Sequence, residues 1–461
     1  MGRTDRRLGL LLLNVIWLAL AWADLAAAAD APRPPTPQPA AEQPNTAAPA
    51  ADPPQSERLA VTDGWLNGAR LLHLPDWLSF SFSWTAEPFM NPVGGVRELS
   101  NWVQQSSLSL AASSGLAKPT PQWREVDHWS VNLDVTHNAG DPSYASTIGA
   151  LFPLQQVAYP TGFLLSELSL SRSSGSGWLQ FKGGIMPINP PFITAPIFNS
   201  YVHSAFNNTL NLSLVNRFSP STVTLPISPY AALGGSVSLQ AAPDLNLRYG
   251  WFDLGSTSSI AGWLGGATLP PLGGGGGAQL LQLDWSPAAL GPPSGADLQA
   301  CRSGSGVQRR GLSCSRPVQV SSQMPPGLIS LGGISSSNLG EAAYASLTLR
   351  SGVPLGLDER VWIGGSWSRT AEQNPGPSFV GGGWLIQGLL PSRPLDLLVF
   401  GAGRANGLGS GYEGVIELGY QWQVNSNVNL QPTLQWIIHP NGATPAPPGI
   451  LAAGLQISVN F

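Results

Sequence analysis

The chain has 461 residues, of which 43% are hydrophobic and only 10% are charged, and its formal net charge is −4 at pH 7. Soluble proteins carry about 25% charged residues, so this low charge favours a membrane protein. Lysine occurs only as Lys118 and Lys182, and this lack of a basic face excludes nucleic-acid binding.

The first 29 residues have the pattern of a secretory signal peptide. Three arginines within the first seven residues precede an apolar stretch from Leu8 to Ala21, and four alanines follow at 26–29. This order is typical of a segment that is removed at export. The alternative is an N-terminal membrane anchor, but the apolar stretch is short for a spanning helix, which needs about 20 residues. We expect cleavage near Ala29.

Residues 30–57 are rich in Pro and Ala and have no hydrophobic periodicity. Such a stretch cannot bury enough apolar surface to fold, so we expect a disordered linker. The linker could reach the cell wall, which makes the cell wall a candidate partner. The remaining residues, 58–461, would form the working domain.

Polar and apolar residues alternate with a period of two in many segments of this domain. The last segment places Leu455, Ile457, Val459 and Phe461 on one side and polar residues on the other, and the chain stops on the aromatic Phe461. Six further segments alternate in the same way, at 78–84, 129–136, 179–185, 245–251, 416–424 and 428–438. Alternation over such lengths predicts β-strands with one apolar face.

The alternating strands could belong to a membrane barrel or to a water-soluble β-sandwich. Trp84, Trp129 and Trp251 lie near strand ends, where an aromatic girdle meets the lipid headgroups. After residue 29, no run of about 20 apolar residues could form a spanning helix. Since backbone groups in lipid must all be paired, a membrane protein without such helices closes into a barrel. We therefore predict an all-β fold, a transmembrane antiparallel β-barrel.

The joins between predicted strands differ in length. Residues 425–427 are a short turn, whereas 254–278 and 286–326 are long and rich in Gly, Ser and Pro. We expect the short turns at one rim of the barrel and the long loops at the other. Cys301 and Cys314 are the only cysteines, and in an exported protein we expect a disulfide between them. Two thiols with no nearby histidine are a poor zinc site, so we predict no metal.

Residues 430–440, which read LQPTLQWIIHP, resemble the penultimate strand of the carbohydrate-selective porin (OprB) family. Further resemblances follow in the family's order at 86–95, 198–206, 228–234 and 389–396. The resemblance implies a 16-stranded barrel in the outer membrane, surrounded by lipid, with passive uptake of sugars or other small polar solutes.

The resemblance also implies a Gram-negative-type envelope. In some cyanobacterial relatives a surface-layer homology domain stands where this chain has its linker, so a cyanobacterial source is one expectation. A homo-oligomer is another, although the sequence carries no trimer signal.

Strand parity predicts which side chains point into the lumen, where charged and hydrogen-bonding groups set the selectivity of a pore. The predicted pore-lining charges are Asp134, Glu167, Lys182, Arg248, Arg350 and Glu417. The predicted neutral partners are Gln421, Gln431 and Gln435, and the aromatic faces offered to a sugar are Trp178 and Trp362. The competing interpretation for any single residue is that it only solvates the wall.

An enzyme is the function that the residues support least. His128 and His137, with Asp127, Asp134 and Asp141 nearby, form the one suggestive cluster, and no serine elbow or metal-ligand spacing accompanies it. We therefore predict a channel that is not an enzyme and needs no cofactor. A general ion or solute porin without sugar selectivity and a structural barrel that anchors the envelope are the alternatives.

Overall fold

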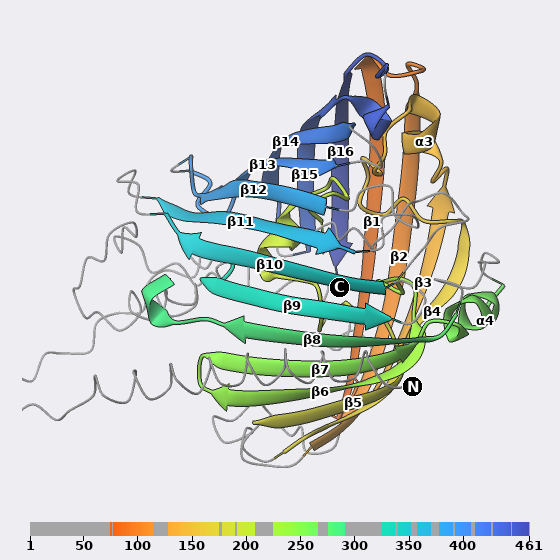
Figure 1. Cartoon of the computed structure of the whole chain (residues 1–461), viewed down its shortest axis with the longest axis vertical. Coiled ribbons are helices and arrows are strands. Elements are labelled where there is room, and N and C mark those ends of the chain that lie inside the picture. The colour runs from red at the N-terminus through yellow and green to blue at the C-terminus, as the bar shows by residue number, and fades with distance from the viewer. Residues whose placement is uncertain are drawn as a thin grey trace, which may run out of the picture. The chain divides into compact units, whose positions relative to one another are not determined.

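The computed structural model describes residues 74–75, 77–113, 128–174, 178–189, 191–207, 225–265, 275–290, 324–336, 340–351, 357–369, 378–390, 392–406, 411–425, 427–443 and 445–460. These residues form 16 strands in a closed antiparallel ring (Figure 1), in which each strand pairs with its neighbours in sequence and β1 pairs with β16. The predicted 16-stranded barrel is therefore confirmed.

The strands alternate in direction around the ring. Their bounds are β1 Leu78–Val93, β2 Ser100–Ser113, β3 His128–Gly140, β4 Gly162–Ser173, β5 Leu179–Met186, β6 Ala232–Ala242, β7 Leu245–Asp253, β8 Gly277–Trp285, β9 Leu328–Ser336, β10 Gly340–Arg350, β11 Asp358–Ser368, β12 Ser378–Gln387, β13 Leu397–Asn406, β14 Tyr412–Gln423, β15 Val428–Ile438 and β16 Ile450–Asn460.

The period-two pattern separates an apolar outer face from a filled interior. On β15, Leu434 and Trp436 are 45% and 51% exposed, whereas the alternate residues Gln431 and Gln435 are at most 1% exposed. Side chains of a strand point to opposite faces in turn, so the exposed set faces outward and the glutamines face the lumen. Their burial shows that other parts of the chain cover this stretch of the inner wall.

Short helical turns lie in the connections. They are α3 (Tyr144–Ile148), η3 (Pro196–Ser200), α4 (Ser256–Gly262), η5 (Ala288–Leu290) and η7 (Pro440–Gly442). Among the described residues, no helix is both long and apolar enough to cross a membrane. Most of the buried apolar side chains in the largest cluster come from the β3–β4 and β5–β6 connections and from the strands that they touch. The core therefore lies inside the ring.

Connections alternate between the two rims because neighbouring strands run antiparallel. The β7–β8 connection, 254–276, lies at one rim, and the β8–β9 connection, 286–327, lies at the other together with the short β14–β15 turn. The expectation that the long loops share one rim is wrong, because the number of strands crossed, and not the loop length, sets the rim. The signal peptide, the linker and Cys301–Cys314 lie outside the described residues.

Candidate functional site: the lumen

The β3–β4 connection, residues 141–161, folds into the ring and is here called the first inserted segment. Glu413 on β14 accepts hydrogen bonds from the backbone N–H groups of Leu151 at 2.7 Å and Phe152 at 3.4 Å. Glu87 on β1 accepts one from Val157 at 3.0 Å. Both glutamates are at most 1% exposed. They supply partners that irregular buried backbone otherwise lacks, so the segment is tied to the wall.

The second inserted segment comprises residues 191–207 of the β5–β6 connection. Glu417 on β14 binds it with both carboxylate oxygens, since Oε1 accepts from the backbone nitrogen of Val202 and Oε2 from that of His203, each at 2.8 Å. Gln431 on β15 donates to the carbonyl oxygen of Ser200 at 3.0 Å. Glu417 thus holds two consecutive backbone N–H groups of this segment against β14 and is an anchor of the segment.

The side chain of His203 is fully buried inside the barrel. Its Nδ1 accepts a hydrogen bond from the backbone nitrogen of Ala205 at 3.1 Å, so the ring is an acceptor at that atom. Burial lowers the pKa of His203 to about 3, because an apolar surrounding penalises the charged ring. The imidazole is therefore neutral at physiological pH.

An aromatic group from the second inserted segment lies against wall glycines. Trp362 on β11 donates from Nε1 to the Tyr201 hydroxyl at 2.6 Å, and that hydroxyl donates to the carbonyl oxygen of Phe400 at 2.9 Å. A Cβ at Gly383 would lie 2.2 Å from the Tyr201 hydroxyl, and one at Gly401 would lie 2.7 Å from the Tyr201 ring. Only glycine leaves room for this close approach.

The inner wall from β4 to β10 carries ion pairs and is here called the ion-pair wall. Lys182 on β5 pairs with Glu167 on β4 at 2.7 Å, and Arg248 on β7 pairs with Asp284 on β8 at 2.5 Å. The cationic side chains are 28% and 23% exposed and the carboxylates about 10%. Arg350 on β10 continues the row, at 3.7 Å from a carboxylate of β11. Each cation thus has an anionic neighbour, and Arg248 also donates from Nη1 to the carbonyl oxygen of Pro191 in the second inserted segment at 2.8 Å.

A third segment, which includes residues 324–325 before β9, enters from the rim at which β1 begins and β16 ends. Arg360 on β11 is fully buried, pairs with Asp358 and donates from Nε to the carbonyl oxygen of Pro325 at 2.7 Å. Met324 is 2% exposed and belongs to the same apolar cluster as Trp362. The lumen is thus narrowed by chain from both rims.

The eleven residues predicted to line the pore differ in where the structure places them. Asp134, Glu167, Lys182, Arg248 and Arg350 lie on strands of the ion-pair wall or beside it, and four of them form the ion pairs above. Their pore-lining role stays a prediction.

Glu417, Gln435 and Trp362 are at most 1% exposed and do not reach open lumen. The inserted segments cover them, so the face of Trp362 is not available to a sugar, contrary to the expectation for it. Gln421 donates to Gln431 at 2.9 Å, and Trp178 lies in the turn before β5 with 49% of its surface exposed.

Sequence reasoning missed Glu87, Glu413 and Asp284 as inward residues. Glu413 lies four positions before Glu417 on β14, and the period of two places both on the same face. Extending the alternating segment from residue 416 back to residue 412 would have found it.

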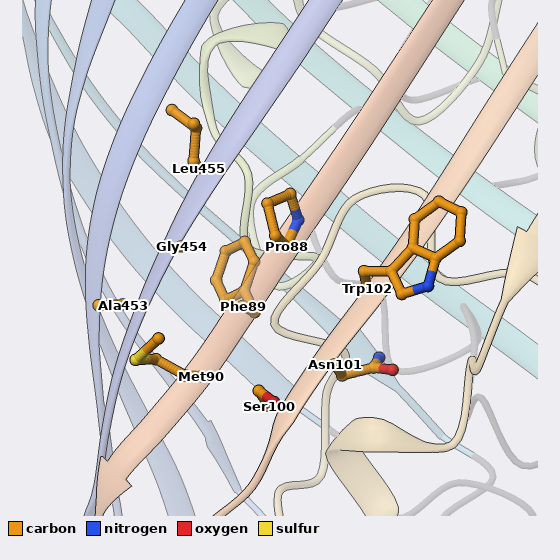
Figure 2. Close-up of a pocket in the computed structure, with 9 residues that line it drawn as sticks. All are labelled: Pro88, Phe89, Met90, Ser100, Asn101, Trp102, Ala453, Gly454 and Leu455. Atoms are coloured by element: carbon orange, nitrogen blue, oxygen red, sulfur yellow. The ribbon is translucent and has the colours of Figure 1, made fainter.

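A shallow hollow marks the outer face of the barrel at the seam of β1, β2 and β16 (Figure 2). Its lining includes Pro88, Met90, Trp102, Ala453 and Leu455, which are outward side chains. The lining is almost entirely apolar, and no group of three metal-ligating side chains occurs among the described residues. The lumen is therefore the candidate functional site.

Comparison with known proteins gives the family. The model of the family described as "Carbohydrate-selective porin, OprB family" matches residues 122–461. The chain belongs to this family. It is therefore an outer-membrane porin for the diffusion of sugars, a channel and not an enzyme, as the sequence predicts.

One solved porin shows the same fold, and two further solved structures are less similar. The high-pH structure of Pseudomonas putida OprB is 16% identical, with 86% of this chain and 96% of that chain covered and a TM-score of 0.65. Its low-pH structure is 14% identical, with 87% and 97% covered and a TM-score of 0.49. A mutant porin of Rhodopseudomonas blastica is 9% identical, with 83% and 100% covered and a TM-score of 0.46. No curated protein matches the chain.

Proposed function

We propose that small neutral sugars cross the lumen along the ion-pair wall. The observation that carries this proposal is the pairing of Lys182 with Glu167 and of Arg248 with Asp284 on partly exposed lumen side chains. Paired charges offer hydrogen-bond donors and acceptors to hydroxyl groups while their net field is small. Such a wall favours polar, uncharged solutes over ions of either sign.

Conductance of the purified full-length protein in a planar bilayer tests this proposal. We expect open channels with weak ion selectivity, whose current decreases when glucose or maltose is added. Channels that prefer one ion strongly would contradict the compensated wall. The absence of channels from folded protein would contradict the pore itself.

A general porin without sugar selectivity is the second candidate. It is favoured by the burial of Tyr201 and Trp362, whose aromatic faces would otherwise stack on a sugar ring. In this case the bilayer current would not respond to sugar beyond the effect of viscosity. A dextran of matched viscosity that is too large to enter the pore is the control that separates the two candidates.

We further propose that lipid of a Gram-negative-type outer membrane, of a cyanobacterial kind, surrounds the barrel. Outward side chains such as Leu170 and Phe181, each 48% exposed, support contact with acyl chains. We also propose that copies of the barrel associate with one another and that residues 30–57 attach to the cell wall. Chemical crosslinking in native membranes tests the first, and sedimentation with purified cell wall tests the second.

A further inference from the structure

The helix α4 lies outside the ring of strands, beside β4 (Figure 1). Its Ile260 packs in one cluster with Leu165 on β4 and Ile185 on β5. Ile185 pairs with Leu168 and with Leu233, which are 44% and 50% exposed. Residues directly paired across strands share a face, so Ile260 covers the outer wall. Ala261 of the same helix belongs to the inner cluster with Leu164 and Phe252, so α4 lies across the rim with its Ile260 side on the outer face.

The β7–β8 connection is held in this outward position by local hydrogen bonds. The Ser256 hydroxyl accepts from the backbone nitrogen of Leu233 at 2.8 Å and donates to the carbonyl oxygen of Asp253 at 2.6 Å. The buried side chains of α4 are Thr257, Ile260 and Ala261, which fixes the face that meets the barrel. These bonds tie the start of α4 to the end of β7 and the start of β6.

The other side of α4 presents large apolar side chains. Trp263 and Leu264, directly after the helix, are 61% and 42% exposed. Residues 254–265 contain no charged side chain. The neighbouring outward residues Leu233 and Trp251, 50% and 45% exposed, belong to the apolar outer face of the barrel. The exposed side of α4 thus continues the surface that faces lipid.

We propose that α4 is a membrane-interface helix, with Trp263 and Leu264 inserted where the lipid headgroups meet the acyl chains. The helix covers Leu165 and Ile185, which lie three residues and one residue from the strand ends at the rim away from the chain ends of the barrel. Tryptophan prefers this depth because its ring is apolar and its N–H can reach water. The partner is the lipid bilayer, and the proposal rests on the membrane location of the barrel.

Spin labels can measure this depth directly. In a background with Cys301→Ser and Cys314→Ser, we would label Trp263→Cys, with Leu170→Cys as lipid control and Glu98→Cys, at the same rim, as water control. The protein would be placed in phosphatidylcholine and phosphatidylglycerol vesicles. We expect the ratio of collisions with oxygen to collisions with a nickel chelate to be several-fold higher at position 263 than at position 98.

The controls separate failure of this proposal from failure of the fold. A water-like ratio at 263 with a lipid-like ratio at 170 overturns the interface helix alone, whereas a water-like ratio at 170 contradicts the membrane barrel.

A second measurement needs no label. Trp263→Phe should remove part of the tryptophan fluorescence that is quenched by lipids brominated near the headgroup. Unchanged quenching would overturn the proposal.

Discussion

The carboxylate of Glu417 lies 2.8 Å from the backbone nitrogen of His203, a residue 214 positions earlier in the chain. This contact joins the wall of the barrel to a segment that fills part of its lumen. The glutamates that hold the inserted segments therefore set the width of the channel, whereas the strands set only the position of the wall.

Glu417→Gln should widen the channel and lower its stability. The amide keeps one acceptor oxygen but turns a donor toward one of the two N–H groups of Val202 and His203. We expect a loss of about 1–3 kcal/mol in the unfolding free energy, together with larger and noisier single-channel currents. Glu341→Gln is the matched control, because Glu341 is an exposed partner of Arg369 and should change stability by less than about 1 kcal/mol. Equal effects of both substitutions would contradict the anchoring role.

Gly401→Ala should displace the aromatic group of the second inserted segment. The new Cβ would lie 2.7 Å from the Tyr201 ring, so the ring must move, at a cost of about 1–3 kcal/mol. Conductance should rise if the segment leaves the wall. Gly183→Ala, where the nearest atom is 3.8 Å from the new Cβ, should leave the thermal midpoint and conductance unchanged.

Charge substitutions on the ion-pair wall should shift ion selectivity in opposite directions. Lys182→Gln leaves the carboxylate of Glu167 without its cation and should favour potassium over chloride, whereas Glu167→Gln should favour chloride. A change of about kT in the local potential alters the permeability ratio roughly threefold. Reversal potentials in a salt gradient measure this ratio. Shifts of the same sign in both variants would show that the pair does not face the ion path.

Acid should weaken the hold of the second inserted segment through His203. Its pKa is about 3 in the folded protein and near 6.5 when the ring is exposed. Between these two pH values, His203 binds a proton only when the segment is released. The inserted state therefore loses about 1.4 kcal/mol of stability relative to the released state for each unit by which the pH decreases from 6.5 toward 3.

Above pH 6.5 the contribution of His203 to the stability of the inserted state is constant. Conductance and thermal midpoint followed over this range test the effect, which should be absent in His203→Asn. His137→Asn should keep it, because His137 lies on the outer face against Phe163.

Asp396→Asn should destabilise the rim turn between β12 and β13 without changing conductance. Asp396 is 3% exposed and accepts hydrogen bonds from Arg393 at 2.9 and 3.0 Å, from the Tyr420 hydroxyl at 2.8 Å and from the backbone nitrogen of Gln423 at 3.1 Å. Asp396 is buried while Arg393 is 34% exposed, so leaving the donors around Asp396 without a full set of acceptors should cost about 1–3 kcal/mol. Asp244→Asn, in an exposed turn, should shift the thermal midpoint far less.

The strands could be predicted from sequence because alternation is a local property. The segments around Trp129, Trp251 and Trp436 each carry the pattern that their strands show in the structure. Parity also gave the inward direction of Glu417 correctly. The two long connections were expected at the same rim because of their length, but only β8 separates them in the chain, and one antiparallel strand places them at opposite rims.

The inserted segments could not be predicted, because their contacts are remote in sequence and their residues lack a period. Val202 meets Glu417 at a separation of 215 residues, and Leu151 meets Glu413 at 262. Trp362 illustrates the consequence. Its inward direction follows from parity, but its burial depends on Tyr201, whose side-chain position no local pattern reveals.

The pairing of β1 with β16 has a consequence for assembly of the protein. Among the 16 strands, Leu78–Val93 comes first in the chain and Ile450–Asn460 last, so one edge of the first strand stays unpaired until the last strand is in place. A product that lacks the last strand would expose the edges of both β1 and β15 and could not shield its backbone from lipid. Ring closure thus requires β1 and β16 together, so a product without either strand cannot become a stable membrane protein.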